Sequence, residues 1–223
     1  MRNGKGFRRN VLLLGLTSFL NDLSSEMIVP ILPMFIQSLG GSSLVIGLIA
    51  GLRKCIANTL KVICGYLSDR SGKRKVFVVT GYLTSSIFKL LLAFSKAWYD
   101  ATAFISLERL GKGLRTAPRD AIIAESMPKE RGKGFGIHRA LDTLGATLAS
   151  LLVFILFWYL NFDFRTIILV AAILSFTSLI PLKFVKEKQA KPKKVSLSVS
   201  LSRLPKKLKL FIAIASLFAL ANF

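Results

Sequence analysis

Acidic residues are scarce in this chain. Asp and Glu together number 11 against 32 Lys and Arg, which gives a formal net charge of +21. A soluble nucleic-acid-binding protein can be this basic, but it is rarely 52% hydrophobic, as this chain is. Both facts fit a chain whose basic residues lie in loops between membrane-spanning segments. The composition therefore disfavours nucleic acid as a partner.

Histidine and cysteine are also rare, which limits the metal and redox chemistry open to the chain. His138 is the only histidine, and Cys55 and Cys64 are the only cysteines. On a helix these two cysteines would lie about 13 Å apart, too far for a disulfide, so we expect two small buried apolar side chains. No zinc-ligand spacing, phosphate-binding loop or credible nucleophile–base pair occurs. The sequence predicts no metal, no cofactor and no enzymatic activity.

Long hydrophobic runs, in contrast, are frequent. Each approaches or exceeds the ~20 residues that a helix needs to cross a bilayer. The runs cover residues 11–37, 44–67, 76–94, 98–118, 135–160 and 166–185, and a further run begins near Leu208 and continues to Phe223. We therefore predict an all-α integral membrane protein with a six-helix transmembrane bundle at 1–185, a basic cytoplasmic linker at 186–207 and an incomplete seventh transmembrane helix at 208–223.

The basic residues alternate from loop to loop. The N-terminal tail, the segment 68–75, the segment 119–133 and the stretch after Lys183 are all basic, whereas the intervening loops carry almost no charge. Short loops rich in Lys and Arg are retained on the cytoplasmic side of a membrane. The pattern predicts a multi-pass protein of the cell membrane with its N-terminus in the cytoplasm.

Many ionisable residues fall inside the predicted spans. Each would cost about 2.5–3.5 kcal/mol or more if it faced lipid at mid-depth, so we expect these side chains to face the bundle interior or water. On a helix they form polar stripes, which indicates a shared aqueous cavity. The residues predicted to line a substrate and proton pathway are Asp22, Glu26, Arg53, Lys54, Lys61, Arg109, Lys112, His138, Arg139 and Asp142. Lys89 and Glu108 are also ionisable residues within these spans.

Depth along the helices suggests partners for these charges. At about 1.5 Å per residue, Glu26 lies level with Arg53 and Lys54. The same arithmetic pairs Asp22 with Arg109, and Asp142 with Lys112. These pairs are either static salt bridges that support the bundle or parts of a transport path. Asp22 and Glu26 are the stronger functional candidates, because partial desolvation helps a carboxylate to bind and release a proton near neutral pH.

The segment from Gly65 to Lys75, Gly-Tyr-Leu-Ser-Asp-Arg-Ser-Gly-Lys-Arg-Lys, is a tight, charged loop between two apolar runs. It resembles the loop between helices 2 and 3 of the major facilitator superfamily, with Lys73 in place of an arginine. The resemblance implies that Asp69 has a gating role and that Arg74 pairs with Asp120 or Glu125 at the end of helix 4. The residues to which it assigns conformational gating are Gly65, Asp69, Arg70, Gly72, Lys73, Arg74 and Asp120.

A second stretch, Arg109-Leu110-Gly111-Lys112-Gly113, is similar to the superfamily's fourth-helix motif, but Lys112 replaces a glutamine. The family's fifth-helix Gly-Pro motif, associated with antiporters, is missing around Gly145. The resemblance implies the N-terminal half of the fold, a 3+3 inverted repeat. It implies secondary transport of a small solute by alternating access, coupled to protons, with lipid, solute, protons and a missing C-terminal half as partners. The alternative is a truncated or half-length membrane protein that binds or regulates without transporting; substrate and direction stay open.

Overall fold

The computed structural model describes residues 3–187 and 205–221, and nearly all of these are helical. No strand is assigned within these two ranges. The helices are α1 (Asn3–Ser38), α2 (Ser43–Ser71), α3 (Arg74–Ala93), α4 (Trp98–Ser126), α5 (Arg131–Phe154), the π-helical turn η1 (Ile155–Tyr159), α6 (Phe164–Thr177), α7 (Leu179–Lys183) and α9 (Lys206–Ala221).

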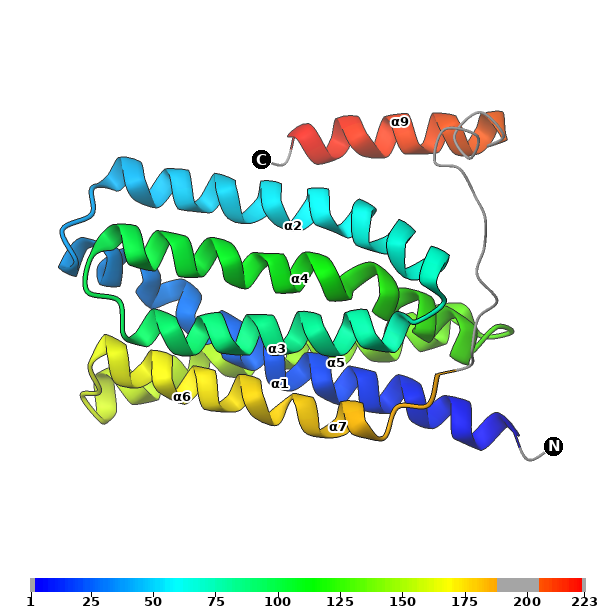
Figure 1. Cartoon of the computed structure of the whole chain (residues 1–223), viewed down its shortest axis with the longest axis horizontal. Helices are drawn as coiled ribbons and strands as arrows, with labels where there is room; N and C mark the ends of the chain where they lie inside the picture. Colours follow the sequence, from blue (N-terminus) through cyan, green and yellow to red (C-terminus); the bar gives the residue numbers. More distant parts are fainter. Residues whose placement is uncertain (1–2, 188–204, 222–223) are drawn as a thin grey trace.

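The long helices lie side by side and run in alternating directions (Figure 1). The main packing pairs are α3 with α4, α1 with α5 and α2 with α4, while α6 covers both α1 and α3. The start of α1 and the α2–α3 and α4–α5 turns gather at one end of the bundle (Figure 1). The basic segments recognised in the sequence therefore share one end, as a repeated crossing of a membrane requires.

All six predicted spans are helices. Five of them are long and apolar enough to cross a membrane by composition alone, and α4 is the exception. At 29 residues α4 is long enough, but acidic and basic residues recur along it. The helices also extend beyond the predicted spans, so that Asp69 and Arg70 belong to the last turn of α2. The predicted loop 68–75 is thus reduced to Gly72 and Lys73.

Two apolar clusters and several close helix crossings hold the bundle together. One cluster centres on Phe35 and Ile167, and the other on Val11 and Tyr82. At the α3–α4 crossing, a Cβ added to Gly81 would lie 2.7 Å from the Gly111 carbonyl oxygen. Such contacts let the backbones approach closely, as small residues do between membrane helices.

Two smaller expectations have different outcomes. Both cysteines are free, but Cys55 is exposed and only Cys64 is buried; the expectation of two buried cysteines is wrong because α2 packs on the bundle through a narrow stripe. The predicted linker lies largely outside the described residues, and α9 begins at its end. The division into bundle, linker and seventh span stays a prediction.

Candidate functional site

A cavity of about 450 Å³ opens between α1, α2, α4 and α5. We call it the charged cavity. Its lining residues are Asp22, Lys61, Lys112, Arg115, Thr116, Arg119, Asp120, Phe135, His138, Arg139 and Asp142. The cavity therefore brings together six of the predicted pathway residues, from four different helices.

Ser18 of α1 lies beside this cavity and joins three other helices. Its hydroxyl lies 2.9 Å from the Tyr82 hydroxyl and 3.0 Å from His138 Nε2, and it accepts a 2.8 Å hydrogen bond from Arg119. Ser18 itself is almost completely buried. One small hydroxyl thus fixes the positions of a phenol, an imidazole and a guanidinium.

Two arginines of α4 are held by neighbouring side chains. Arg115 donates a 2.6 Å hydrogen bond to Ser85 Oγ, and its guanidinium lies 4.3 Å from the centre of the Tyr82 ring. Arg119 pairs with Asp120 at 3.1 Å. Asp120 is therefore engaged by its sequence neighbour and lies at the cavity.

Asp142 interacts within its own helix. Its Oδ2 lies 3.9 Å from His138 and 4.0 Å from Arg139, one turn earlier on α5. The predicted ion pair with Lys112 is wrong, although both residues line the charged cavity, because the neighbours at i−4 and i−3 are closer. The other oxygen, Oδ1, is buried and has no hydrogen-bond partner among the described residues.

A second hollow of about 340 Å³ lies between α2 and α4. Arg53, Lys54, Asn58, Arg109 and Lys112 line it together with two alanines. Lys112 also lines the charged cavity, so the two hollows adjoin. The predicted pathway residues Arg53, Lys54 and Arg109 thus line one hollow with Lys112.

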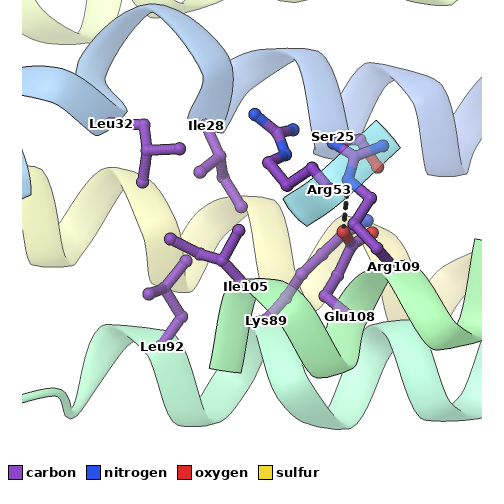
Figure 2. Close-up of a pocket in the computed structure, with 9 residues that line it drawn as sticks. All are labelled: Ser25, Ile28, Leu32, Arg53, Lys89, Leu92, Ile105, Glu108 and Arg109. Carbon is purple, nitrogen blue, oxygen red and sulfur yellow. Dashed lines mark ion pairs between the residues drawn. The ribbon is translucent and has the colours of Figure 1, made fainter. Parts of the chain in front are cut away.

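The innermost hollow is small, about 20 Å³, which suffices for one water molecule. Figure 2 shows Glu108 next to Lys89 and Arg109 in this hollow, with Arg53 reaching in from α2. Glu108 pairs with Arg109 at 3.0 Å, so the predicted pair of Asp22 with Arg109 is wrong. The sequence neighbour is closer than a residue on another helix at similar depth.

The Glu26 prediction fares differently. Arg53 is influenced electrostatically first by Glu108 and then by Glu26. Glu108 therefore acts on Arg53 more strongly than Glu26 does, and the pair of Glu26 with Arg53 or Lys54 stays a prediction. Within the described chain, Arg53 Nε and Glu108 Oε1 are buried without hydrogen-bond partners.

Lys89 borders the innermost hollow and also belongs to a group that we call the packed polar cluster: Asn21, Ser24, Ser86, Lys89 and Ser175. The Lys89 ammonium donates to Asn21 at 3.4 Å, to Ser24 at 3.0 Å and to Ser175 at 3.2 Å. Lys89 is 1% exposed. Neutral oxygens from α1 and α6 therefore take up all three of its donors.

The gating motif forms a charged network at the basic end. Arg74 contacts Asp69 at 2.7 Å and Glu125 at 2.6 Å, which joins α2, α3 and α4. Of the two predicted partners of Arg74 the structure selects Glu125. Gly72 ends α2 with φ of 67°, a backbone conformation that glycine adopts readily.

The other motif residues surround this network. A Cβ on Gly65 would lie 3.0 Å from Ala117 Cβ, so this glycine supports close packing of α2 on α4. Arg70 and Lys73 are exposed. Glu187 accepts hydrogen bonds from the backbone N–H groups of Arg74 at 2.6 Å and Lys75 at 3.1 Å. The segment after α7 therefore caps α3 beside the network, a contact that sequence spacing did not indicate.

Four charged residues that line these hollows have no role in the predicted pathway or gate: Lys89, Glu108, Arg115 and Arg119. The first three fall within predicted spans, so their charge was a usable signal. Depth alone did not separate them from the residues chosen, because it does not give the direction in which a side chain points.

Comparisons with known proteins identify the family of this chain. The model of the Major Facilitator Superfamily matches residues 14–223. An uncharacterized MFS-type transporter of Methanocaldococcus jannaschii is 60% identical over 222 residues, which cover 99% of this chain and 56% of that protein. Multidrug resistance protein MdtH of Cronobacter sakazakii is 30% identical over 141 residues, covering 63% of this chain and 34% of that protein. The chain thus spans little more than half the length of these relatives.

Solved structures agree on the fold. The peptide transporter POT superposes with a TM-score of 0.71 at 20% identity, covering 95% of this chain and 45% of that one. A bacterial homolog to the human lysosomal transporter Spinster, in an inward-facing and occupied conformation, gives 0.67 at 17% identity, covering 82% and 46%. Sequence and fold together show that this multi-pass membrane protein belongs to the major facilitator superfamily.

Proposed function

We propose that the chain provides the N-terminal half of a secondary transporter that moves a small solute by alternating access. The charged cavity carries this proposal. Ionisable side chains on four membrane helices share a hollow of about 450 Å³, and charged groups at membrane depth mark solute or ion paths. Two relatives, an MFS-type transporter and a multidrug resistance protein, are named as proteins of transport and resistance, which supports transport.

Proton coupling is the second part of the proposal. Asp22 and Asp142 line the charged cavity, Glu108 lines the innermost hollow, and Glu26 lies near Arg53. Each carboxylate can bind a proton when a nearby cation moves away or when a solute takes the place of the carboxylate beside that cation. Glu108 joins the predicted acids because one of its oxygens is buried without a partner in the described structure.

The network of Asp69, Arg74 and Glu125 supports a gating role at the basic end. Arg74 is only 7% exposed, whereas Asp69 and Glu125 are about half exposed. Donor groups of a second half of the transporter that contact the two acids would compete with Arg74 for them and shift the balance between open and closed states. The alternating basic loops support a location in the cell membrane with the N-terminus in the cytoplasm.

Reconstitution tests the transport proposal. The chain is placed in liposomes that contain a pH-sensitive dye, and proton movement is followed after addition of candidate solutes and an imposed pH gradient. We expect solute-dependent proton flux, from the chain alone or after a second half is added, and this flux is expected to fall at least tenfold in Asp22→Asn and Glu108→Gln. Asp163→Asn is the matched control, because this exposed acid lies between η1 and α6.

The alternative, a binding or regulatory half, has its own outcome in the same assay. Rocking of two repeats about a midplane site requires both halves, and this chain covers 56% of its relative from Methanocaldococcus jannaschii. Flux that appears only when the remaining half of that relative is co-reconstituted would assign transport to the pair. Solute binding without flux in either preparation would favour the binding role.

A further inference from the structure

We propose that the transported solute is a small oxyanion, carrying a carboxylate, sulfate or phosphoryl group, and that Arg53, Arg109 and Lys112 bind it. This inference rests on the proposed function and names its substrate class. It follows from the charge balance, the pairing and the placement of the side chains around the three adjoining hollows.

Bases outnumber acids by more than two to one among the lining residues. The bases are Arg53, Lys54, Lys61, Lys89, Arg109, Lys112, Arg115, Arg119 and Arg139, and the acids are Asp22, Glu108, Asp120 and Asp142. A hollow with this balance attracts anions and repels cations. A cationic solute is therefore disfavoured.

Most of the acids are already engaged. Glu108 pairs with Arg109 and Asp120 with Arg119, while Asp142 lies 4.0 Å from Arg139 on its own helix. Lys61 and Lys112 have no ion pair within 4 Å in the described structure, and Arg53 Nε is buried without a hydrogen-bond partner. An uncompensated cation at membrane depth is costly, so a bound anion would stabilise Lys112. The same anion would supply an acceptor for Arg53 Nε, although Glu108 and Glu26 already offset part of the Arg53 charge.

Arg53 and Arg109 are placed to hold such an anion. Both line the 20 Å³ hollow and the 340 Å³ hollow, from α2 and α4, so they lie at the junction of the two. A guanidinium offers parallel N–H donors that match the oxygens of a carboxylate, sulfate or phosphate. Lys112 adds a third cation where the larger hollow adjoins the charged cavity.

The pairing of Glu108 with Arg109 links the anion to the proton. An oxyanion that binds Arg109 displaces the Glu108 carboxylate from its nearest cation. The carboxylate then takes up a proton from the bulk solution. The O–H bond of Glu108 is the only bond that forms, so one proton and one anion are taken up together. The two therefore move in the same direction through this site.

Binding by the purified chain in detergent micelles tests the proposal. Thermal unfolding is measured with potassium sulfate, phosphate or succinate, at ionic strength held constant with potassium chloride. Tetraethylammonium chloride and sorbitol are the cationic and neutral comparisons. We expect at least one oxyanion to raise the melting temperature in a saturable manner, and its apparent affinity to fall at least tenfold in Arg53→Gln and in Lys112→Gln.

A control variant and a measurement of proton uptake accompany the binding experiment. Lys129→Gln removes an exposed lysine between α4 and α5 and is expected to bind as the unsubstituted chain does. In weakly buffered solution, oxyanion binding is expected to take up protons, and Glu108→Gln is expected to abolish this uptake. If Arg53→Gln does not fold, Lys61→Gln together with Lys112→Gln replaces it.

Three results would overturn the proposal: no oxyanion stabilises the chain more than chloride, the cavity variants bind as tightly as Lys129→Gln, or only tetraethylammonium stabilises. Solute flux in liposomes without oxyanion binding would refute this inference and leave transport intact. Oxyanion binding without flux would support the binding site and refute transport by it.

Discussion

Lys89 and Lys112 lie in the same membrane bundle but in contrasting surroundings. Lys89 is in the packed polar cluster, where three neutral oxygens accept its hydrogen bonds. Lys112 lines two hollows and has no described ion pair. The same residue type therefore joins helices in one region and faces open space in the other.

This difference separates charged side chains that stabilise the packing of helices from charged side chains that are available to bind a solute. Buried polar groups in folded proteins are normally hydrogen-bonded, and those that are not call for an explanation. Lys89 meets that rule, whereas Arg53 and Glu108 keep buried atoms without partners in the described structure. Unsatisfied charge beside a hollow is what a site that binds and releases solute requires.

The largest effect is expected where the packed region has no free space. Gly111→Leu places a side chain against Gly81 and Ser85 of α3, so we expect the free energy of unfolding to fall by about 3 kcal/mol or more. Unfolding in detergent measures this loss. Gly47→Leu is the control, because a Cβ at Gly47 meets no atom within 4 Å. Equal stability of the two variants would contradict the packing described at α3–α4.

A smaller loss is expected for the packed polar cluster. Lys89→Ala removes three hydrogen bonds and leaves space between α1, α3 and α6, at an expected cost of about 2 kcal/mol. Lys61→Ala, at an exposed cavity lysine, should change stability by no more than about 0.5 kcal/mol. If both substitutions cost the same, the contrast between the two regions would not hold.

Ser18 tests the border between the two regions. Ser18→Ala removes the hydroxyl that contacts Tyr82, Arg119 and His138, so we expect a loss of about 1 kcal/mol in unfolding free energy. Ser150 is an exposed serine that bonds only a carbonyl of its own helix, and Ser150→Ala serves as the reference with almost no change. If Ser18→Ala is as stable as the unsubstituted chain, water replaces the hydroxyl, and the region around Ser18 is accessible to water.

The smallest effect lies outside both regions, at Asp163. A hydrogen bond with the Thr166 hydroxyl lowers the pKa of the Asp163 carboxyl below its usual value of 3.8. Because the folded-state pKa is the lower one, the stabilisation is present above the ordinary pKa and is lost as the pH falls through the folded-state value. Asp163 is exposed, so we expect only about 0.3 kcal/mol. Asp163→Asn should lose this increment above about pH 4, so that its stability declines less than that of the unsubstituted chain as the pH falls below this value; an unchanged acid profile would exclude the contact.

The sequence predicted the helices well because apolar length and helical period are properties of single segments. It placed Asp22, Lys112 and Asp142 correctly around one cavity. It failed on two pairs, Asp22 with Arg109 and Asp142 with Lys112. Depth supplied one coordinate, whereas Glu108 and His138 were closer along their own helices to Arg109 and Asp142. The cap that Glu187 forms on α3 could not be predicted, because it depends on how the chain returns after α7.

Water accessibility tests the central claim most directly. In a background with Cys55→Ser and Cys64→Ala, single cysteines are introduced as Thr116→Cys, at the charged cavity, and Ser175→Cys, in the packed polar cluster. Both chains are treated in liposomes with a charged, water-soluble thiol reagent. We expect Thr116→Cys to be labelled rapidly and Ser175→Cys to be labelled only after unfolding. Equal labelling of the two, or protection of Thr116→Cys in every condition, would contradict a solute path between α1, α2, α4 and α5.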